Sequence, residues 1–245
     1  MDRAAFAHMA ATEATHWWFV GRRSVIDAVL DGIELPKDGT ILEAGCGTGG
    51  NFATLARRGH ITAFDPHIDA LAFAQNRHPE VDIRQGALPS ELPYDEGSFD
   101  LVAALDVLEH VEDDRSSAHS LVSLVRPGGW LLVTVPAHQA LWGSHDRRLH
   151  HRRRYGRQQL LRLFADCDVD LVRITPFNIV LSPIAIVYRV GERLLGFDLG
   201  NQERLLPRPI NATFGSLFRL ESTLVRRGVP IPFGLSYAAI YQRRP

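Results

Sequence analysis

From residue 40 onward, short apolar segments alternate with longer segments that have a helical pattern. Most of the apolar segments are continuous, which is typical of strands that are buried on both faces of a parallel sheet. Strands are predicted at residues 40–45, 60–65, 81–86, 99–106, 130–136, 169–175 and 235–244. The alternation of strands and helices predicts an α/β fold in which helices cover both faces of one sheet.

The bulk composition excludes several classes of protein. The chain has 245 residues, of which 45% are apolar, so it can bury a substantial core without a disulfide or a structural metal ion. Its two cysteines, Cys46 and Cys167, lie in different settings and predict neither a disulfide framework nor a zinc ribbon. The N-terminal residues lack the apolar core of a signal peptide, and the most apolar segment, 176–188, is too short to span a bilayer. We expect a cytoplasmic protein, with membrane association left open.

The sequence LEAGCGTGGN, residues 42–51, joins the first predicted strand to the helix that follows it. Its glycines allow a tight turn and a close approach of the backbone to a ligand, although such a turn can also be purely structural. A dinucleotide-binding turn would have the order G-x-G-x-x-G, whereas the glycines here stand at positions 45, 47, 49 and 50. Glu43 precedes them, and its carboxylate suits a cationic ligand better than a pyrophosphate.

Acidic residues follow two other predicted strands. Asp65 ends the second strand about twenty residues after the glycine turn, where nucleotide-binding α/β folds place a carboxylate that binds ribose. The alternative is that Asp65 caps the next helix. Asp106, Glu109 and His110 follow the fourth strand and are expected at the same sheet edge, unless the last two only cap and solvate a helix. The glycine turn and Asp65 together favour a nucleotide-like ligand.

Four segments appear in the order that is found in class I S-adenosylmethionine-dependent methyltransferases. They are ILEAGCGTGGN, AFD, GSFDLVAALDVLEHVED and LVRPGGWLLVTVP, and they cover roughly residues 40–136. The chain most resembles the branch similar to the ubiquinone and menaquinone biosynthesis methyltransferases, methyltransferase type 11. The resemblance implies a Rossmann-like class I fold with a seven-stranded, mostly parallel sheet and an antiparallel last strand. It also implies S-adenosyl-L-methionine as the cofactor and S-adenosyl-L-homocysteine as the product.

The resemblance also assigns residues to the cofactor. Glu43 and the glycines of the turn would line its methionine part, Asp65 would hold the ribose, and Asp106 would contact the amino acid portion. Many relatives have an acidic residue after the third strand that binds the adenine amine, but residues 86–88 of this chain carry no carboxylate. The expected cofactor-binding residues are Glu43, Gly45, Cys46, Gly47, Gly49, Asn51, Asp65, Pro66, Ala87, Leu88, Asp106 and His110.

The sequence HDRRLHHRRRY, residues 145–155, follows the fifth predicted strand and therefore leaves from the same sheet edge. Its histidines and aspartate could bind a metal ion, but its five arginines would repel a cation and no compact ligand motif is present, so we predict no metal site. The net charge of −1 and the lack of further basic segments disfavour a nucleic-acid patch. One alternative is that the segment is only a solvated loop. Its position after the fifth strand instead favours a substrate loop whose arginines bind an anionic group.

Histidines and a tyrosine of this loop are candidates for acid–base chemistry at the methyl acceptor. Similar family members have a tryptophan, an aspartate, a histidine and an Arg-Tyr pair at comparable spacing. In this chain those residues are Trp142, Asp146, His150 or His151, Arg154 and Tyr155. The candidate catalytic residues are His110, His145, His150 and Tyr155, and the candidate substrate-binding residues are Trp18, Arg22, Trp142, Arg153 and Arg154.

The N-terminal sequence EATHWWFVGRR, residues 13–23, contains three aromatic residues beside paired arginines. It could form a lid over the cofactor, with Arg22 or Arg23 pairing with a carboxylate of the cofactor or an anionic group of the substrate. It could also form an amphipathic helix that packs its aromatic side chains on the sheet, and the two interpretations are compatible. We therefore divide the chain into an N-terminal helical lid (1–36), a methyltransferase core (37–176 with 234–245) and an inserted helical cap or substrate region (177–233).

The insertion mixes apolar runs with scattered arginines. This would suit an amphiphilic or lipid-linked substrate with an anionic group, or else a dimerisation surface or a small core. We expect methyl transfer to a small molecule by a monomer or homodimer, without a nucleic-acid partner, because the Asn/Asp-Pro-Pro-Tyr segment of methyltransferases acting on nucleobase amines is absent. The alternatives are a protein that binds S-adenosylmethionine without methyl transfer, and a nicotinamide-dependent oxidoreductase, against which Glu43 and the glycine order argue.

Overall fold

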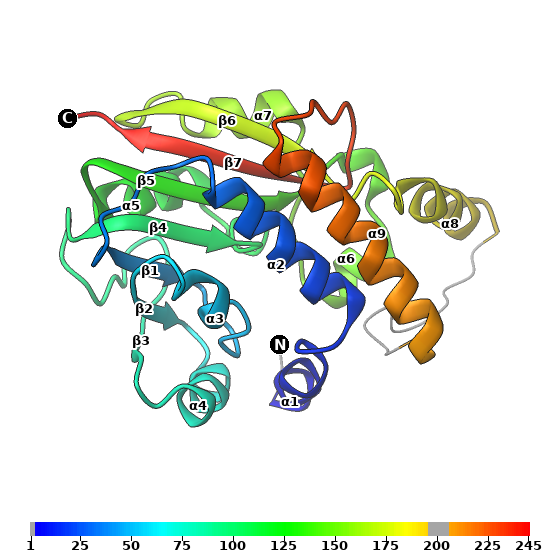
Figure 1. Ribbon diagram of the computed structural model, residues 1–245, viewed down its shortest axis with the longest axis horizontal. Coiled ribbons are helices and arrows are strands. Elements are labelled where there is room, and N and C mark those ends of the chain that lie inside the picture. The colour runs from blue at the N-terminus through cyan, green and yellow to red at the C-terminus, as the bar shows by residue number, and fades with distance from the viewer. Residues whose placement is uncertain (1–2, 196–205) are drawn as a thin grey trace.

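The computed structural model describes residues 3–195 and 206–245, and these residues form one seven-stranded sheet (Figure 1). Its strands are β1 (Thr40–Ala44), β2 (His60–Asp65), β3 (Asp82–Gln85), β4 (Phe99–Leu105), β5 (Val125–Pro136), β6 (Val169–Phe177) and β7 (Ser236–Arg243). The order is β3-β2-β1-β4-β5-β7-β6, in which β1 to β5 run parallel and β7 runs antiparallel to both neighbours. The predicted fold class is confirmed.

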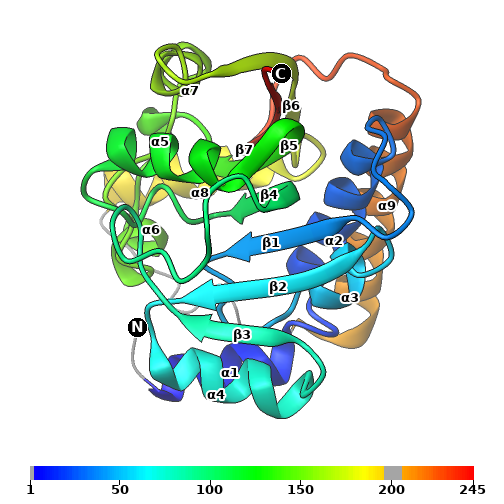
Figure 2. The ribbon, with the colours of Figure 1, turned by 90° about the vertical axis from the view of Figure 1, so that its left-hand side faces the viewer.

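Helices cover both faces of this sheet. They are α1 (Arg3–Thr12), α2 (Trp17–Leu30), α3 (Phe52–Leu55), α4 (Ile68–Arg77), α5 (Asp114–Leu124), α6 (Ser144–Arg148), α7 (Arg157–Leu163), α8 (Ser182–Leu195) and α9 (Arg208–Arg226). On one face α2 and α9 lie side by side, and α5 and α7 lie on the other (Figures 1 and 2). α1 packs against α4 beside the β3 edge of the sheet (Figure 2).

Two apolar clusters hold these layers together. Successive residues of a strand point to opposite faces, so Ile41 packs with the α2 and α9 cluster while Leu42 packs with the α5 and α7 cluster. Phe218 of α9 and Leu160 of α7 are buried in these two clusters. Burial of each such side chain contributes about 1.5–3 kcal/mol. The packed sheet therefore fixes the positions from which the loops at its carboxyl edge begin.

Three elements differ from those that the sequence predicts. β5 begins at Val125 rather than at Trp130, because Val125 already pairs with Phe99 of β4. The helix predicted after the glycine turn is the short helix α3. The charged loop after β5 contains a helix, α6, whose first turn is closed by the Asp146 carboxylate accepting the N–H of Gly143 at 2.9 Å. A side chain that bonds its own backbone is hard to recognise inside a run of charges.

The predicted insertion reaches two different parts of the fold. α9 runs along α2 on a face of the sheet, whereas α8 contacts the loop after β5 (Figure 1). Residues 196–205 of the insertion lie outside the described residues. Within the described ranges, no helix has the length and hydropathy needed to cross a bilayer. The division into lid, core and insertion stays a prediction.

Candidate functional site

The glycine turn between β1 and α3 contains three left-handed backbone positions. Gly45, Gly47 and Gly49 have φ values of +72°, +55° and +80°, where a side chain would be strained. A Cβ atom at Gly45 would also lie 2.7 Å from the Val107 side chain. The N–H groups of Gly45 and of the next residue donate to the Phe64 carbonyl at 2.8 and 3.1 Å, which ties the turn to β2.

Asp65 stands at the carboxyl end of β2 and is buried. Its carboxylate accepts hydrogen bonds from the N–H groups of Gly47 and His67, both at 2.9 Å. His67, and not Asp65, is the N-cap residue of α4. A carboxylate can accept about four hydrogen bonds, so these two backbone bonds fix Asp65 and leave it capacity for the hydroxyl groups of a ligand.

A polar chain links α2 to the carboxyl ends of β1 and β4. Nη1 of Arg22 donates to Oδ2 of Asp106 at 2.6 Å, and Oδ1 of Asp106 accepts from the Thr134 hydroxyl at 3.1 Å. Asn51 joins the same guanidinium to Glu43, with Arg22 Nη2 3.4 Å from Asn51 Oδ1 and Asn51 Nδ2 2.7 Å from Glu43 Oε1. Burial raises the pKa of Glu43 to about 8, although Asn51 and Arg22 act to lower it. Arg22 therefore serves two carboxylates of the sheet edge.

A pocket of about 500 Å³ opens at this edge, between α1, the glycine turn and the loops that follow β4 and β5. It brings together eight of the predicted residues, which are Gly45, Asp65, Pro66, Ala87, Leu88, Asp106, His110 and His150. Phe6, Met9 and Arg152, which sequence analysis did not select, also line it, as does His67, which the resemblance places beside the adenine. The predicted cofactor residues outside the lining belong to β1, the turn and the start of α3, and they are Glu43, Cys46, Gly47, Gly49 and Asn51.

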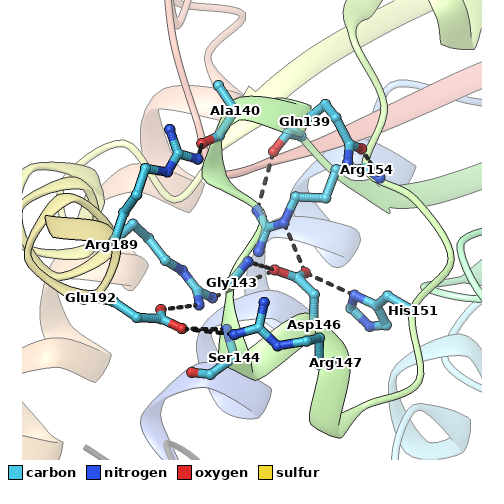
Figure 3. A network of polar contacts seen from close by, with 12 residues as sticks. Gln139, Ala140, Gly143, Ser144, Asp146, Arg147, His151, Arg154, Arg189 and Glu192 are labelled. Atoms are coloured by element: carbon cyan, nitrogen blue, oxygen red, sulfur yellow. Dashed lines mark hydrogen bonds and ion pairs between the residues drawn. The ribbon is translucent and has the colours of Figure 1, made fainter. Parts of the chain in front are cut away.

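The loop after β5 is organised by a buried carboxylate (Figure 3). Asp146 is fully buried and accepts hydrogen bonds from Arg154 Nε at 2.8 Å and from the N–H of Gly143 at 2.9 Å. The same carboxylate lies 3.0 Å from Nδ1 of His151. Burial alone would raise the pKa of Asp146, but His151 and Arg154 outweigh this and hold the pKa below the usual range of a carboxyl. Asp146 therefore stays ionised and fixes the loop.

α8 joins this network from the other side (Figure 3). Arg189 Nη2 lies 3.8 Å from Asp146 Oδ2, and Glu192 Oε1 accepts the N–H of Ser144 at 2.6 Å. Arg193 Nη2 donates to a backbone carbonyl of the same loop at 2.9 Å. The position of the loop therefore depends on α8 as well as on the sheet.

Glu109 and His110 lie next to this network, in the loop after β4. Glu109 is fully buried, and neither of its carboxylate oxygens has a hydrogen-bond partner within the described part of the chain. Burial raises the pKa of Glu109, and the charge of Asp106 adds to this effect. The rings of His110 and His151 meet edge to face with 4.8 Å between their centroids. Burial lowers the pKa of His110 to about 4, so its imidazole is neutral near pH 7.

Comparison with known proteins shows what the segment around this sheet edge is similar to. The family model described as a methyltransferase domain matches residues 42–133, which contain the glycine turn, Asp65 and the loop after β4. Residues 42–133 are therefore similar to a methyltransferase domain, and the relatives that match the chain include a probable S-adenosylmethionine-dependent methyltransferase of Mycolicibacterium smegmatis, 38% identical over 99 residues.

Relatives of the methyltransferase domain match part of the chain. A ubiquinone biosynthesis O-methyltransferase of Azotobacter vinelandii is 41% identical over 103 residues, which cover 39% of this chain and 43% of that protein. An uncharacterized methyltransferase of Mycobacterium bovis is 36% identical over 124 residues, which cover 47% of this chain and 62% of that protein. The chain spans 37% to 62% of the length of the first relatives that it matches.

A solved structure shares the fold over most of the chain. It is geranyl diphosphate C-methyltransferase of Streptomyces coelicolor, in complex with Mg²⁺, geranyl diphosphate and S-adenosyl-L-homocysteine. The TM-score is 0.57 at 17% identity, and the match covers 89% of this chain and 77% of that protein. At this identity, the likeness shows the fold alone.

Three predicted residues of the charged loop are absent from the lining of this pocket. Arg154 is 9% exposed and pairs with the buried carboxylate of the loop, while Arg153 Nη1 lies 2.6 Å from Asp114 Oδ2. The buried hydroxyl of Tyr155 donates to the same Asp114 at 2.8 Å, and burial raises the pKa of Tyr155. The arginine of this loop that lines the pocket is Arg152.

Four further predicted residues are absent from the pocket lining of the described chain. Trp18 packs in the core against Phe218 with 5.7 Å between ring centroids, as expected for an amphipathic helix docked on the sheet. Arg22 pairs with the acidic residue after β4 instead of facing the pocket directly. His145, whose pKa burial lowers to about 3, and Trp142 lie elsewhere in the loop after β5.

Sequence analysis placed Glu109 at this sheet edge and named His151 as an alternative to His150, but it selected neither of them, nor Arg152, as a candidate site residue. A signal for them exists in the topology, because β4 and β5 are parallel neighbours whose following loops meet at one edge. The pair Glu109-His110 after β4 and the run His150-His151-Arg152 after β5 are brought together in this way.

Proposed function

We propose that this protein transfers a methyl group from S-adenosyl-L-methionine to a small amphiphilic acceptor that carries an anionic group. One observation carries the proposal: the same pocket is lined by Gly45, Asp65 and Asp106 and also by His110 and Arg152. Methyl transfer needs the donor and the nucleophile in line, about 3 Å apart, and much of its rate comes from this positioning. A pocket of about 500 Å³ has the size of a site for small molecules.

For the cofactor, we assign Asp65 to the ribose hydroxyl groups and the glycine turn to the methionine part. Asp106 would accept from the ammonium group of the methionine part, with Arg22 holding the Asp106 carboxylate in place at 2.6 Å. The adenine would lie against Leu88, with the backbone near Ala87 in place of the acidic residue of many relatives. Phe6 and Met9 of α1 line the same pocket, which supports an N-terminal lid over the cofactor.

For the acceptor, we assign Arg152 to the anionic group. Its side chain is at the pocket, and its Nε donates to the His110 carbonyl at 3.2 Å. His110 is neutral near pH 7 because burial lowers its pKa to about 4. A neutral imidazole can accept a proton from an acceptor hydroxyl, so His110 is the base that we propose. His150 also lines the pocket and is the second candidate.

The outer face of α8 supports an acceptor with an apolar or lipid-linked body. Ile184, Val187, Leu194 and Leu195 are all exposed, and their spacing places them on one side of the helix. The other side of α8 holds the loop after β5 that borders the pocket. An acceptor anchored in a lipid surface would meet this apolar face close to the pocket.

The proposal is tested by incubating the full chain with methyl-labelled S-adenosylmethionine and a panel of acceptors that differ in charge and lipid tail. We expect label transfer and release of S-adenosylhomocysteine with anionic amphiphiles. Arg152→Gln should raise the KM for an anionic acceptor at least tenfold and leave cofactor affinity unchanged, whereas Arg148→Gln, which alters an exposed arginine of the same loop, should change neither. Methylation of neutral water-soluble acceptors alone would contradict the substrate class, and cofactor binding without turnover on any acceptor would favour a binding protein.

A further inference from the structure

Glu109 is the least compensated ionisable side chain near the pocket. Its relative exposure is 0%, and both carboxylate oxygens lack a hydrogen-bond partner among the described residues. A buried carboxyl without partners costs several kcal/mol, and nearly all buried polar groups in folded proteins are satisfied. Two imidazoles lie near this carboxyl group. One possible metal-ligand atom from each of Glu109, His110 and His151 lies within 4.8 Å of the other two.

His151 is oriented as a metal-binding histidine would be. Its Nδ1 lies 3.0 Å from the Asp146 carboxylate (Figure 3). With Nδ1 donating to this carboxylate, Nε2 has the lone pair that can bind an ion. Asp146 is in turn fixed by Arg154 at 2.8 Å and by the N–H of Gly143 at 2.9 Å. A carboxylate that orients a histidine from behind is the usual second layer of a metal site.

We propose that Glu109, His110 and His151 bind a divalent transition-metal ion, with Zn²⁺ as the best match. Two imidazole nitrogens and one carboxylate oxygen are typical of a zinc site that keeps its fourth position open. Ligand atoms at about 2.1 Å from one ion are at most roughly 4.2 Å apart, so a small closure of the three side chains completes the site. The site borders the pocket, because His110 lines it.

From the sequence, the arginines of residues 145–155 are expected to repel a cation. In the structure, carboxylates pair with the three arginines that are next to His151 in the sequence. Arg154 is neutralised by Asp146, and Arg153 is paired with Asp114 at 2.6 Å. Arg152 has Glu112 at 3.5 Å. Asp106 adds a negative charge beside Glu109, which favours a cation at this place.

An ion at this place would bind an oxygen of the acceptor at its open position, beside the proposed cofactor site. With the ion bound, His110 is a ligand and cannot accept a proton, so the base at the acceptor would then be His150, which also lines the pocket. This use of the ion rests on the proposed methyl transfer, whereas binding of the ion does not. A metal-bound hydroxyl loses its proton more readily than a free one, so the site would favour acceptors with a hydroxyl or an enol oxygen.

The test is metal binding by the full chain, without cofactor or acceptor. Chelator-treated protein is titrated with Zn²⁺ by calorimetry and with Co²⁺ by visible absorption, and we expect one ion per chain and a raised Tm. Glu109→Gln, His110→Asn and His151→Asn should each weaken Zn²⁺ binding at least tenfold and alter the Co²⁺ spectrum. His150→Asn changes the adjacent histidine outside the cluster and should bind Zn²⁺ as the wild type does.

Circular dichroism confirms that each variant is folded, and His110, which lines the pocket and belongs to neither of the two large apolar clusters, gives a variant with little risk to folding. Absence of stoichiometric binding by the wild type, or unchanged binding by any of the three folded variants, would overturn the site. Equal weakening in His150→Asn would also overturn it, because binding would then be unspecific. Stoichiometric binding without methyl transfer would sustain the metal site and reject only the proposed function.

Discussion

Replacing Asp65 with asparagine tests the cofactor site most directly. The Asp65 carboxylate is held by two backbone N–H groups, from Gly47 and His67, at 2.9 Å each. Asparagine keeps the shape but has a single acceptor oxygen, and its amide turns a donor toward one of these N–H groups. Hydrogen bonds to a charged group are worth about 1.5–3 kcal/mol each. Losing the charge under two ribose hydroxyl groups should cost about 3 kcal/mol, which corresponds to a Kd for S-adenosylmethionine raised about 100-fold.

The assay is calorimetric titration of the wild type and the variant with S-adenosylmethionine and S-adenosylhomocysteine. Both ligands share the ribose, so we expect the two affinities to fall by similar factors. Asp69→Asn is the matched control, because Asp69 lies on α4 and its ion pair with Arg3 is a long one of 3.9 Å at the surface. A Kd for Asp65→Asn within threefold of the wild-type value would refute the assignment of Asp65 to the ribose.

Three further predictions concern the frame of the site. Gly45→Ala should lower cofactor affinity at least tenfold in the same titration, because φ is +72° and the new Cβ would lie 2.7 Å from Val107. Phe218→Ala should lower the free energy of unfolding in urea by about 3–5 kcal/mol, because it opens a cavity between α9 and α2. Burial acts to raise the pKa of Asp27, but hydrogen bonds from Arg57, Arg58 and Arg226 lower it to about 2 from 3.8. A carboxyl whose pKa is lower in the folded than in the unfolded state stabilises the fold above pH 4, here by about 2 kcal/mol, and this contribution is lost as the pH falls through 2. Asp27→Asn lacks the contribution, so its free energy of unfolding should change less over this pH range than that of the wild type. Equal acid sensitivity of wild type and variant would contradict the prediction.

Much of the fold is predictable because local patterns and tertiary structure agree. The continuous apolar segments become strands that are buried on both faces, and β2 has the predicted bounds, His60–Asp65. The glycine turn is recognisable because three of its backbone positions need left-handed φ values. Asp65 is predictable for a related reason: the end of a parallel strand fixes the edge of the sheet at which a side chain appears.

The charged loop is less predictable because partners distant in sequence decide where its side chains lie. Arg153 and Tyr155 look free in the sequence, yet both bind Asp114, which lies about forty residues earlier in the chain on α5. Arg152, one position before, instead reaches the pocket. In an extended segment, neighbouring side chains point to opposite sides, so the identity of adjacent arginines says little about which one meets a ligand.

The buried Asp146 network has a consequence for how such a pocket can change. Asp146 joins α6, the strand-following segment that carries His151, and Arg189 of α8 in one set of contacts. Since α8 also binds the N–H of Ser144 through Glu192, a substitution on α8 can shift the wall of the pocket without altering any residue that lines it. Under the proposed function, acceptor preference could therefore evolve through α8, which lies outside residues 42–133, while the residues proposed for the cofactor stay unchanged.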